Sequence, residues 1–175
     1  CNTIPPLDFA KAMERKEGVI TQLREGVNAL LTQPGITFIK GEAHFISDHI
    51  IEVNGKQIEA KNIIIASGSR SKTPPFLKEE DITKQKVGEQ KIVTSTEILS
   101  INKIPRRLSI IGAGVIGMEF ASAFSAFGSE VTVIEFMKEC LPPIDSDIAK
   151  RLRKSLEKRG VTFYMQSAVS RIDLC

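Results

Sequence analysis

Three glycines in the middle of the chain have the spacing that brings a backbone close to a phosphate. Gly112, Gly114 and Gly117 follow the pattern G-x-G-x-x-G within residues 108–119. The first glycine of this pattern permits a tight turn, the second leaves no Cβ between the backbone and a pyrophosphate, and the third lets a helix pack on a strand. The amides that open the helix point at the anion, where the helix dipole favours negative charge. The pattern therefore predicts a pyrophosphate site.

Two strands and a carboxylate supply the context that a glycine pattern alone lacks. The apolar run 108–111 predicts a strand, residues 118–127 predict a helix that ends at Gly128, and residues 130–134 predict a second buried strand. Glu135 ends this strand 23 residues after Gly112, where dinucleotide-binding βαβ units place the acid that accepts the ribose hydroxyls. The alternative is an unrelated glycine-rich βα turn in which Glu135 is merely solvated.

The next 30 residues predict a second helix and a third strand. Residues 145–159 have a helical pattern that ends at Gly160, and residues 161–165 form the third strand. Ile148, Leu152 and Leu156 predict the apolar face of this helix. The residues predicted to face water are Lys150, Arg151, Arg153, Lys154 and Lys158. Residues 108–165 therefore predict an α/β, Rossmann-like βαβαβ half-domain, whose strands lie side by side because the crossovers are right-handed.

The N-terminal half predicts a helix followed by a small antiparallel meander. A helix capped by Asp8 should reach about residue 31, and residues 36–46 predict a strand interrupted near Gly41. Asn54-Gly55 lies between alternating strands, which is the strongest short hairpin signal. Residues 62–66 are apolar and predict a fully buried strand. Residues 71–90 show little periodicity and predict a surface connection.

Composition excludes several classes of protein. The 175 residues carry a formal net charge of +3, which is too small to argue for nucleic acid. No apolar run approaches the roughly 18 residues of a membrane span. The three cysteines are odd in number and far apart, without metal or C-x-x-C spacing, so we expect a reduced, cytoplasmic setting. His44 and His49 are too few for a metal site without acidic partners, and we predict none.

Five motifs together resemble those of the dihydrolipoamide dehydrogenases, which are pyridine nucleotide–disulfide oxidoreductases. They are IIASGS (64–69), IVTSTEIL (92–99), IPRRL (104–108), IGAGVIGME (111–119) and GSEVTVIE (128–135). The long helix, the meander and the first of these motifs stand in the family's order, and the resemblance covers essentially the whole chain. It implies a partial FAD-binding domain over residues 1–103 and the first half of an NAD-binding domain over residues 104–175.

The resemblance also implies which residues contact the cofactors. Glu135 would bind the adenosine ribose of NAD, Val169 would lie near the adenine, and Glu119 would face the nicotinamide. The NAD phosphate loop would be formed by Gly112, Ala113, Gly114, Val115, Ile116, Gly117, Met118 and Glu119, and FAD would approach Gly41, Ala43, Ser67, Gly68 and Ser69. Two simpler interpretations stay open: Glu119 as an acid stabilised by the helix dipole, and Gly41 as a β-bulge.

The implied activity is oxidation of a dihydrolipoyl group by NAD through FAD, in a homodimer that acts on the lipoyl group of a partner protein. The family's first G-x-G-x-x-G, its C-x-x-x-x-C redox pair and its catalytic His–Glu pair do not occur in this sequence. We therefore expect an internal fragment that is inactive by itself. The alternatives are another flavoprotein disulfide reductase or NADH oxidase, or a non-catalytic nucleotide-binding module. The sequence does not identify which multienzyme complex the parent serves.

Overall fold

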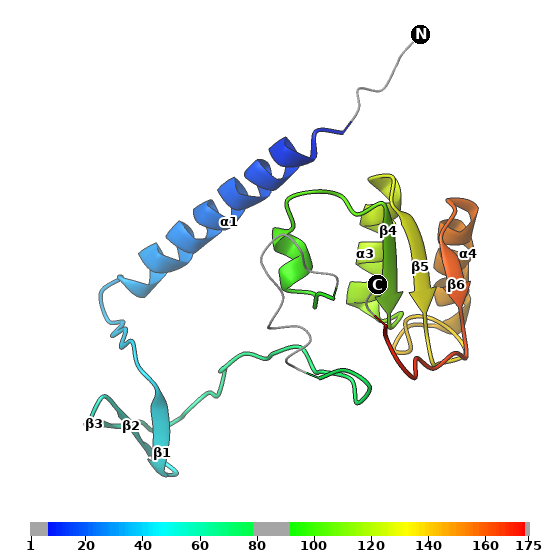
Figure 1. Ribbon diagram of the computed structural model, residues 1–175. Helices are drawn as coiled ribbons and strands as arrows, with labels where there is room; N and C mark the ends of the chain where they lie inside the picture. The colour runs from blue at the N-terminus through cyan, green and yellow to red at the C-terminus, as the bar shows by residue number, and fades with distance from the viewer. Residues whose placement is uncertain (1–6, 79–91, 174–175) are drawn as a thin grey trace. The chain divides into compact units, whose positions relative to one another are not determined.

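The protein consists of two compact units, which we describe separately. The structure is a computed structural model that describes residues 7–78 and 92–173. The meander unit comprises residues 14–70, and the parallel-sheet unit comprises the described residues before 14 and after 70 (Figure 1).

Helix α1 (Phe9–Leu31) begins and ends close to where the sequence predicts. The Asp8 carboxylate accepts a hydrogen bond of 3.1 Å from the backbone N–H of Lys11, which caps the helix as expected. A Cβ added at Gly18 or Gly26 would meet nothing within 4 Å. These glycines therefore mark no close approach within the described residues.

The meander has the predicted hairpin. Strands β1 (Ala43–Ser47), β2 (Ile50–Val53) and β3 (Lys56–Glu59) form an antiparallel sheet in the order β1-β2-β3. Asn54 and Gly55 join β2 to β3 with φ values of 51° and 73°. Positive φ at both central residues is the mark of a type I′ turn, so the hairpin prediction is confirmed.

The predicted strand over residues 36–46 is only partly present, and the predicted strand over residues 62–66 is wrong. Residues 36–40 form no strand, and β1 begins at Ala43. Residues 62–66 are irregular, with Ile64 89% and Ile65 73% exposed. A strand needs a neighbour that satisfies its N–H and C=O groups. The described residues form only the two three-stranded sheets, which include neither segment. An apolar run therefore does not become a strand here, because nothing pairs with it.

The parallel-sheet unit has the predicted α/β order. Its elements are β4 (Arg107–Ile111), α3 (Val115–Ala126), β5 (Glu130–Ile134), α4 (Ser146–Lys158) and β6 (Thr162–Tyr164). The strands are parallel in the order β4-β5-β6, and Figure 1 shows α3 and α4 on one face of the sheet. The Rossmann-like βαβαβ prediction is confirmed.

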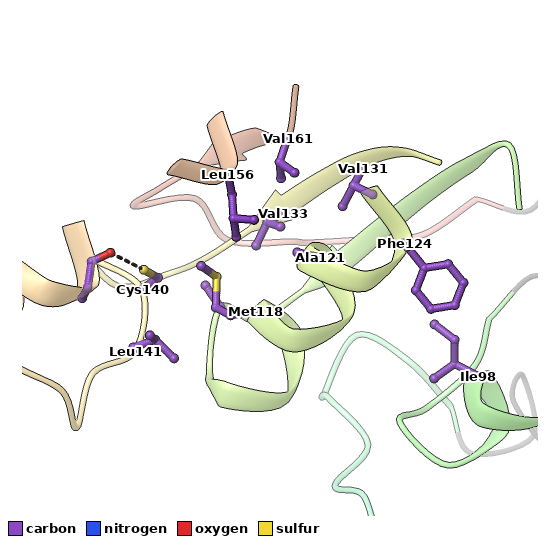
Figure 2. Close-up of a cluster of buried hydrophobic side chains, with 12 residues drawn as sticks. Ile98, Met118, Ala121, Phe124, Val131, Val133, Cys140, Leu141, Leu156 and Val161 are labelled. Carbon is purple, nitrogen blue, oxygen red and sulfur yellow. Dashed lines mark hydrogen bonds between the residues drawn. The ribbon is translucent and has the colours of Figure 1, made fainter. Parts of the chain in front are cut away.

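The core of this unit lies between the sheet and the two helices (Figure 2). Its buried members include Met118, Ala121, Phe124, Val131, Val133, Ala149, Leu156 and Val161. The 3₁₀-helix η1 (Glu97–Ser100) adds Ile98, and Val93, Ile101 and Ile104 pack against the same cluster. Residues 93–101 therefore pack on the parallel-sheet core, although the family resemblance implies that they belong to the partial FAD-binding domain.

The predicted apolar face of α4 is confirmed at Leu156 and is wrong at Ile148 and Leu152. Ala149 and Leu156 are buried, whereas Ile148 and Leu152 are exposed. The reason lies in the preceding loop, because the Cys140 thiol lies 3.4 Å from the carbonyl oxygen of Ala149 and donates to it. The loop therefore covers the Ala149 side of the helix and leaves the Ile148 side outside.

The glycine turn offers a matched test of packing. A Cβ at Gly117 would collide with the backbone oxygen of Gly112, whereas one at Gly114 would meet nothing within 4 Å. We expect Gly117→Ala to lower the free energy of unfolding by about 3 kcal/mol. Gly114→Ala, whose φ is −71°, should cost at most about 1 kcal/mol. Urea unfolding followed by circular dichroism measures both, and equal stability of the two variants would contradict the packing role of Gly117.

Candidate dinucleotide-binding site

The glycine turn has the geometry that its sequence predicts. Gly112 has a φ of 101°, which lies in the left-handed region that favours glycine. Its N–H donates to the carbonyl oxygen of Ile134 at 2.8 Å, so the turn leaves the sheet at the end of β4. Gly117 then brings α3 against the turn, while the Cα of Gly114 faces open space. The backbone conformation therefore explains why residue 112 is a glycine, and helix packing explains Gly117. A ligand close to the backbone would explain why residue 114 is also a glycine.

The N-terminus of α3 carries no side-chain cap within the described residues. Gly114 is the N-cap residue and has no side chain to accept the first amides. The next two side chains, Val115 and Ile116, are exposed and apolar. The opening N–H groups of a helix have no intrahelical partner. They therefore fit an anionic group such as a pyrophosphate.

Glu135 lies directly beside this turn. Its side chain is buried, with 8% exposed. One carboxylate oxygen accepts from the N–H of Ala113 at 2.6 Å, and the other accepts from the N–H of Met137 at 2.8 Å. Each carboxylate oxygen has about two acceptor sites, so each keeps capacity for a ribose hydroxyl. Glu135 can therefore order the glycine turn and bind a nucleotide at once.

One cavity collects three of the predicted NAD residues. It has a volume of about 210 Å³, and Gly112, Glu135 and Val169 line it. The chain after β6 reaches this place because the N–H of Ser167 donates to the carbonyl oxygen of Glu135 at 2.9 Å. The residues that line the cavity and were missed in the sequence are Phe76, Ile111, Ile134, Phe136, Ser167 and Ala168. Phe76 gave no signal, because it follows two prolines in a connection without periodicity.

Among the other predicted NAD residues, Ala113 and Met118 are buried in the core, whereas Glu119 is exposed on α3. No hydrogen bond or ion pair holds its side chain among the described residues. This exposure is compatible with both interpretations of Glu119, and its position toward the nicotinamide stays a prediction.

No hydrogen bond joins the predicted FAD residues to one another among the described residues. Gly41 has a packing explanation of its own: an added Cβ would lie 2.6 Å from the side-chain oxygen of Asn54 and 2.7 Å from Val53. The register irregularity of β1 lies between Phe45 and Ser47, away from Gly41.

The remaining FAD predictions fall on exposed chain. Ala43 begins β1, and Ser67, Gly68 and Ser69 are exposed in irregular chain, with a φ of 79° at Gly68. The FAD contacts of all five residues stay a prediction.

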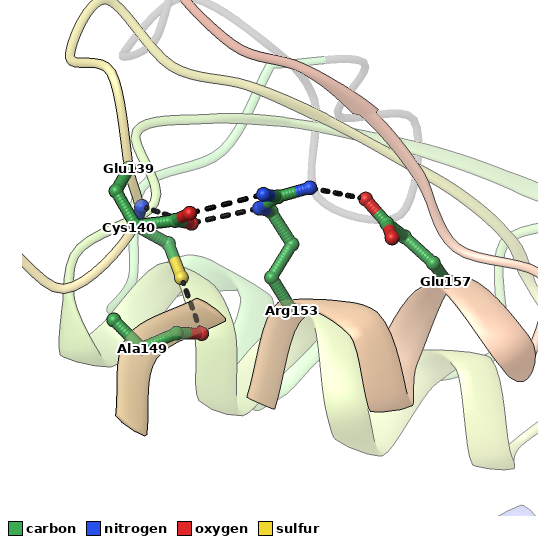
Figure 3. A network of polar contacts seen from close by, with 5 residues as sticks. All are labelled: Glu139, Cys140, Ala149, Arg153 and Glu157. Carbon is green, nitrogen blue, oxygen red and sulfur yellow. Dashed lines mark hydrogen bonds and ion pairs between the residues drawn. The ribbon is translucent and has the colours of Figure 1, made fainter. Parts of the chain in front are cut away.

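A polar network holds the loop between β5 and α4 (Figure 3). Arg153 donates to both carboxylate oxygens of Glu139, at 2.7 Å from Nε and 3.0 Å from Nη2, and to Glu157 at 2.5 Å from Nη1. The prediction that Arg153 faces water is wrong, because only 19% of its side chain is exposed. The hydrogen bond from Arg153 lowers the pKa of Glu139 to about 2.

Metal sites and membrane spans are absent from the parts of the chain that the structure describes. Within residues 7–78 and 92–173, no three His, Cys, Asp or Glu side chains lie close enough to hold a metal ion. The helices within the same ranges are too short or too polar to cross a bilayer.

The fold and the site define a dinucleotide-binding α/β protein of the Rossmann type. The family model for pyridine nucleotide-disulphide oxidoreductases matches residues 2–174, so the chain belongs to this family.

Relatives and solved structures agree with this family. A dihydrolipoyl dehydrogenase of Acholeplasma laidlawii is 37% identical over 166 residues, which are 95% of this chain and 48% of that protein. A mercuric reductase of Bacillus cereus is 35% identical over 170 residues, which are 95% of this chain and 25% of that protein. The Cu(II) complex of a HOCl-induced flavoprotein disulfide reductase from Escherichia coli matches with a TM-score of 0.79 and 35% identity, over 95% of this chain and 37% of that one. The chain thus spans about half the length of these relatives or less.

Cys140 should be chemically inert in the folded protein. Its side chain is 1% exposed, and burial raises the pKa of its thiol to about 11. Since the thiolate is the reactive form, only about one molecule in a thousand would carry it at pH 8. We expect iodoacetamide to leave Cys140 unmodified in the native protein and to alkylate it in urea, as peptide mass spectrometry would show. Rapid native labelling of Cys140 would contradict the buried position.

Glu139 should make stability depend on acid pH. Its pKa is lowered from an ordinary 4.5 to about 2. The stabilisation is therefore fully present above about pH 4.5 and is lost as the pH falls through 2. At pH 7 we expect Glu139→Gln to lower the free energy of unfolding by about 2 to 3 kcal/mol. Urea titrations from pH 2 to 7 would test this, and a difference from the unsubstituted chain that did not shrink toward pH 2 would exclude the ion pair as its cause.

Proposed function

We propose that this chain is part of an FAD- and NAD-dependent dihydrolipoyl dehydrogenase, comprising part of its FAD-binding domain and the first half of its NAD-binding domain. The observation that carries the proposal is the cavity beside the glycine turn, which Gly112, Glu135 and Val169 line. Glu135 is hydrogen-bonded to the turn, and a Cβ at Gly114 in the same turn would meet only open space. Such a cradle suits a dinucleotide because it combines free amides for a pyrophosphate with an acid for a ribose. The proposed domains are residues 1–103 and 104–175.

The residues of this chain bind and orient the pyridine nucleotide in this proposal. The α3 amides hold the pyrophosphate, Glu135 accepts the ribose hydroxyls, and Val169 with Phe76 borders the cavity. When bound, the nicotinamide supplies the hydride chemistry, and the protein supplies position and charge. The proposed FAD contacts at Gly41, Ala43 and residues 67–69 rest on the family resemblance alone.

The proposed reaction converts a dihydrolipoyl group and NAD into a lipoyl group and NADH. Its support is the name of the Acholeplasma laidlawii relative at 37% identity. We further propose that the parent enzyme is a cytoplasmic homodimer whose partner is a lipoyl-bearing protein.

A second candidate keeps the nucleotide site and replaces the dihydrolipoyl group with another substrate that exchanges electrons with the flavin. The mercuric reductase of Bacillus cereus and the Escherichia coli flavoprotein disulfide reductase are each 35% identical to this chain, close to the 37% of the dihydrolipoyl dehydrogenase. Assays of the parent enzyme with dihydrolipoamide, glutathione disulfide and Hg(II) would separate these activities. A nucleotide-binding module without catalysis would show NAD binding and no turnover in any assay.

Nucleotide choice tests the site itself. A buried carboxylate at residue 135 accepts the ribose hydroxyls of NAD but repels the 2′-phosphate of NADP. We expect NAD to bind about 100-fold more tightly than NADP, as measured by isothermal titration calorimetry. Gly114→Val should weaken both nucleotides, because its side chain would fill the open cradle.

Glu135→Arg should narrow the preference for NAD over NADP. Since Glu135 also accepts from Ala113 and Met137, Glu135→Gln serves as the matched control that removes the charge and keeps one acceptor oxygen. Equal affinity of the unsubstituted chain for NAD and NADP would rule out the proposed role of Glu135. An absence of nucleotide binding would rule out the proposed function as a whole.

A further inference from the structure

The backbone of the loop between β5 and α4 touches the glycine turn directly. The N–H of Leu141 donates to the carbonyl oxygen of Ala113 at 2.9 Å. Ala113 is fully buried, and its own N–H donates to Glu135. Two hydrogen bonds therefore hold the peptide groups of the turn. One of them depends on the position of the Leu141 backbone.

Leu141 stands in a conformation that needs support from its surroundings. Its φ is 52°, in the left-handed region that leucine rarely adopts. Such a conformation persists only where neighbouring contacts hold it, and it concentrates at functional sites. The contacts that hold the loop must therefore come from outside Leu141 itself.

Arg153 supplies that support through Glu139. The Glu139 carboxylate is gripped by two guanidinium nitrogens, and one of its oxygens also accepts from the N–H of Cys140 at 3.0 Å. The Cys140 side chain is buried and bonded to the Ala149 carbonyl oxygen. Figure 3 shows this chain of contacts from α4 to the loop. It fixes the residue that immediately precedes Leu141.

The place of Arg153 on α4 argues for a positioning role. It lies one helical turn after Ala149 and three residues before Leu156, which are the two buried residues of this helix. An apolar side chain would be the ordinary choice on that side. A partly buried ion pair is weak evidence of stability, because desolvation offsets the attraction, but its directional bonds define one geometry.

We propose that Arg153 is a positioning residue of the dinucleotide site. Through Glu139 it holds the backbone of Cys140 and Leu141 against Ala113, and so keeps the glycine turn in the conformation that receives the pyrophosphate. This inference rests on the proposed function and adds to it a residue that touches no nucleotide.

The test compares three variants of the full chain. Arg153→Met and Glu139→Gln break the link to the loop, whereas Glu157→Gln removes a partner of the same arginine that does not contact the loop. We expect the first two to weaken NAD binding about tenfold and the third to change it less than twofold, by calorimetry at a temperature where circular dichroism shows all three folded. NAD affinity of Arg153→Met within twofold of the unsubstituted chain would overturn the proposal.

Amide hydrogen exchange separates positioning from general stability. In Arg153→Met the Leu141 amide should exchange at least tenfold faster, while the amides of β5 keep their protection. Uniform acceleration across β5 and α4 would reduce Arg153 to a stabilising residue and overturn the proposal. If the unsubstituted chain binds no NAD, the proposed function fails, and the Leu141 exchange rate still decides whether Arg153 positions the turn.

Discussion

The parallel-sheet unit depends on how one peptide segment, Ala113, is held. Its N–H donates to Glu135, and its carbonyl oxygen accepts from Leu141. These two bonds connect the ends of two parallel strands and the loop that leads to α4. Because Ala113 is fully buried, any unpaired polar group there would cost much of the stability of a small unit. The hydrogen bonds that satisfy the Ala113 peptide groups therefore also fix the shape of the site.

Helices α3 and α4 of the parallel-sheet unit lie on one face of its sheet (Figure 1). Along β4, Leu108 and Ile110 pack on the helical side, while Arg107, Ser109 and Ile111 point the other way and are exposed. The candidate site lies at the carboxyl ends of the strands, which is where open parallel sheets bind their ligands. The helical side thus provides rigidity, and the strand ends provide the chemistry.

The meander unit rests on a different balance. Helix α1 has no buried residue, and Val53 is the buried hydrophobic residue of the meander in the described residues. The shape of its sheet comes from a local rule, namely the type I′ turn at Asn54-Gly55. Gly41 fits beside this turn, where the Asn54 amide donates to the carbonyl oxygen of Lys40 at 2.9 Å. Local hydrogen bonds stabilise this unit, whereas a buried core stabilises the other.

The sequence by itself determined the features that depend on neighbours along the chain. These include the strand–glycine–helix unit at Gly112 and Gly117, the hairpin at Asn54-Gly55, and the helix ends at Gly128 and Gly160. Each is a backbone requirement of a few consecutive residues, and φ values of 96° at Gly128 and 91° at Gly160 show it. The acid at Glu135 was also predictable, because it lies at a regular distance from the glycines.

Only the tertiary structure decided which surfaces pair and which are left open. Periodicity favoured Ile148 and Leu152 as the inner face of α4, but packing of Cys140 on Ala149 selected the neighbouring face and drew Arg153 toward Glu139. Contacts between distant segments also decide that Phe76 lines the cavity. They likewise decide that residues 62–66 have no partner strand. Such outcomes depend on groups far apart in the sequence, and no local pattern encodes the contact between them.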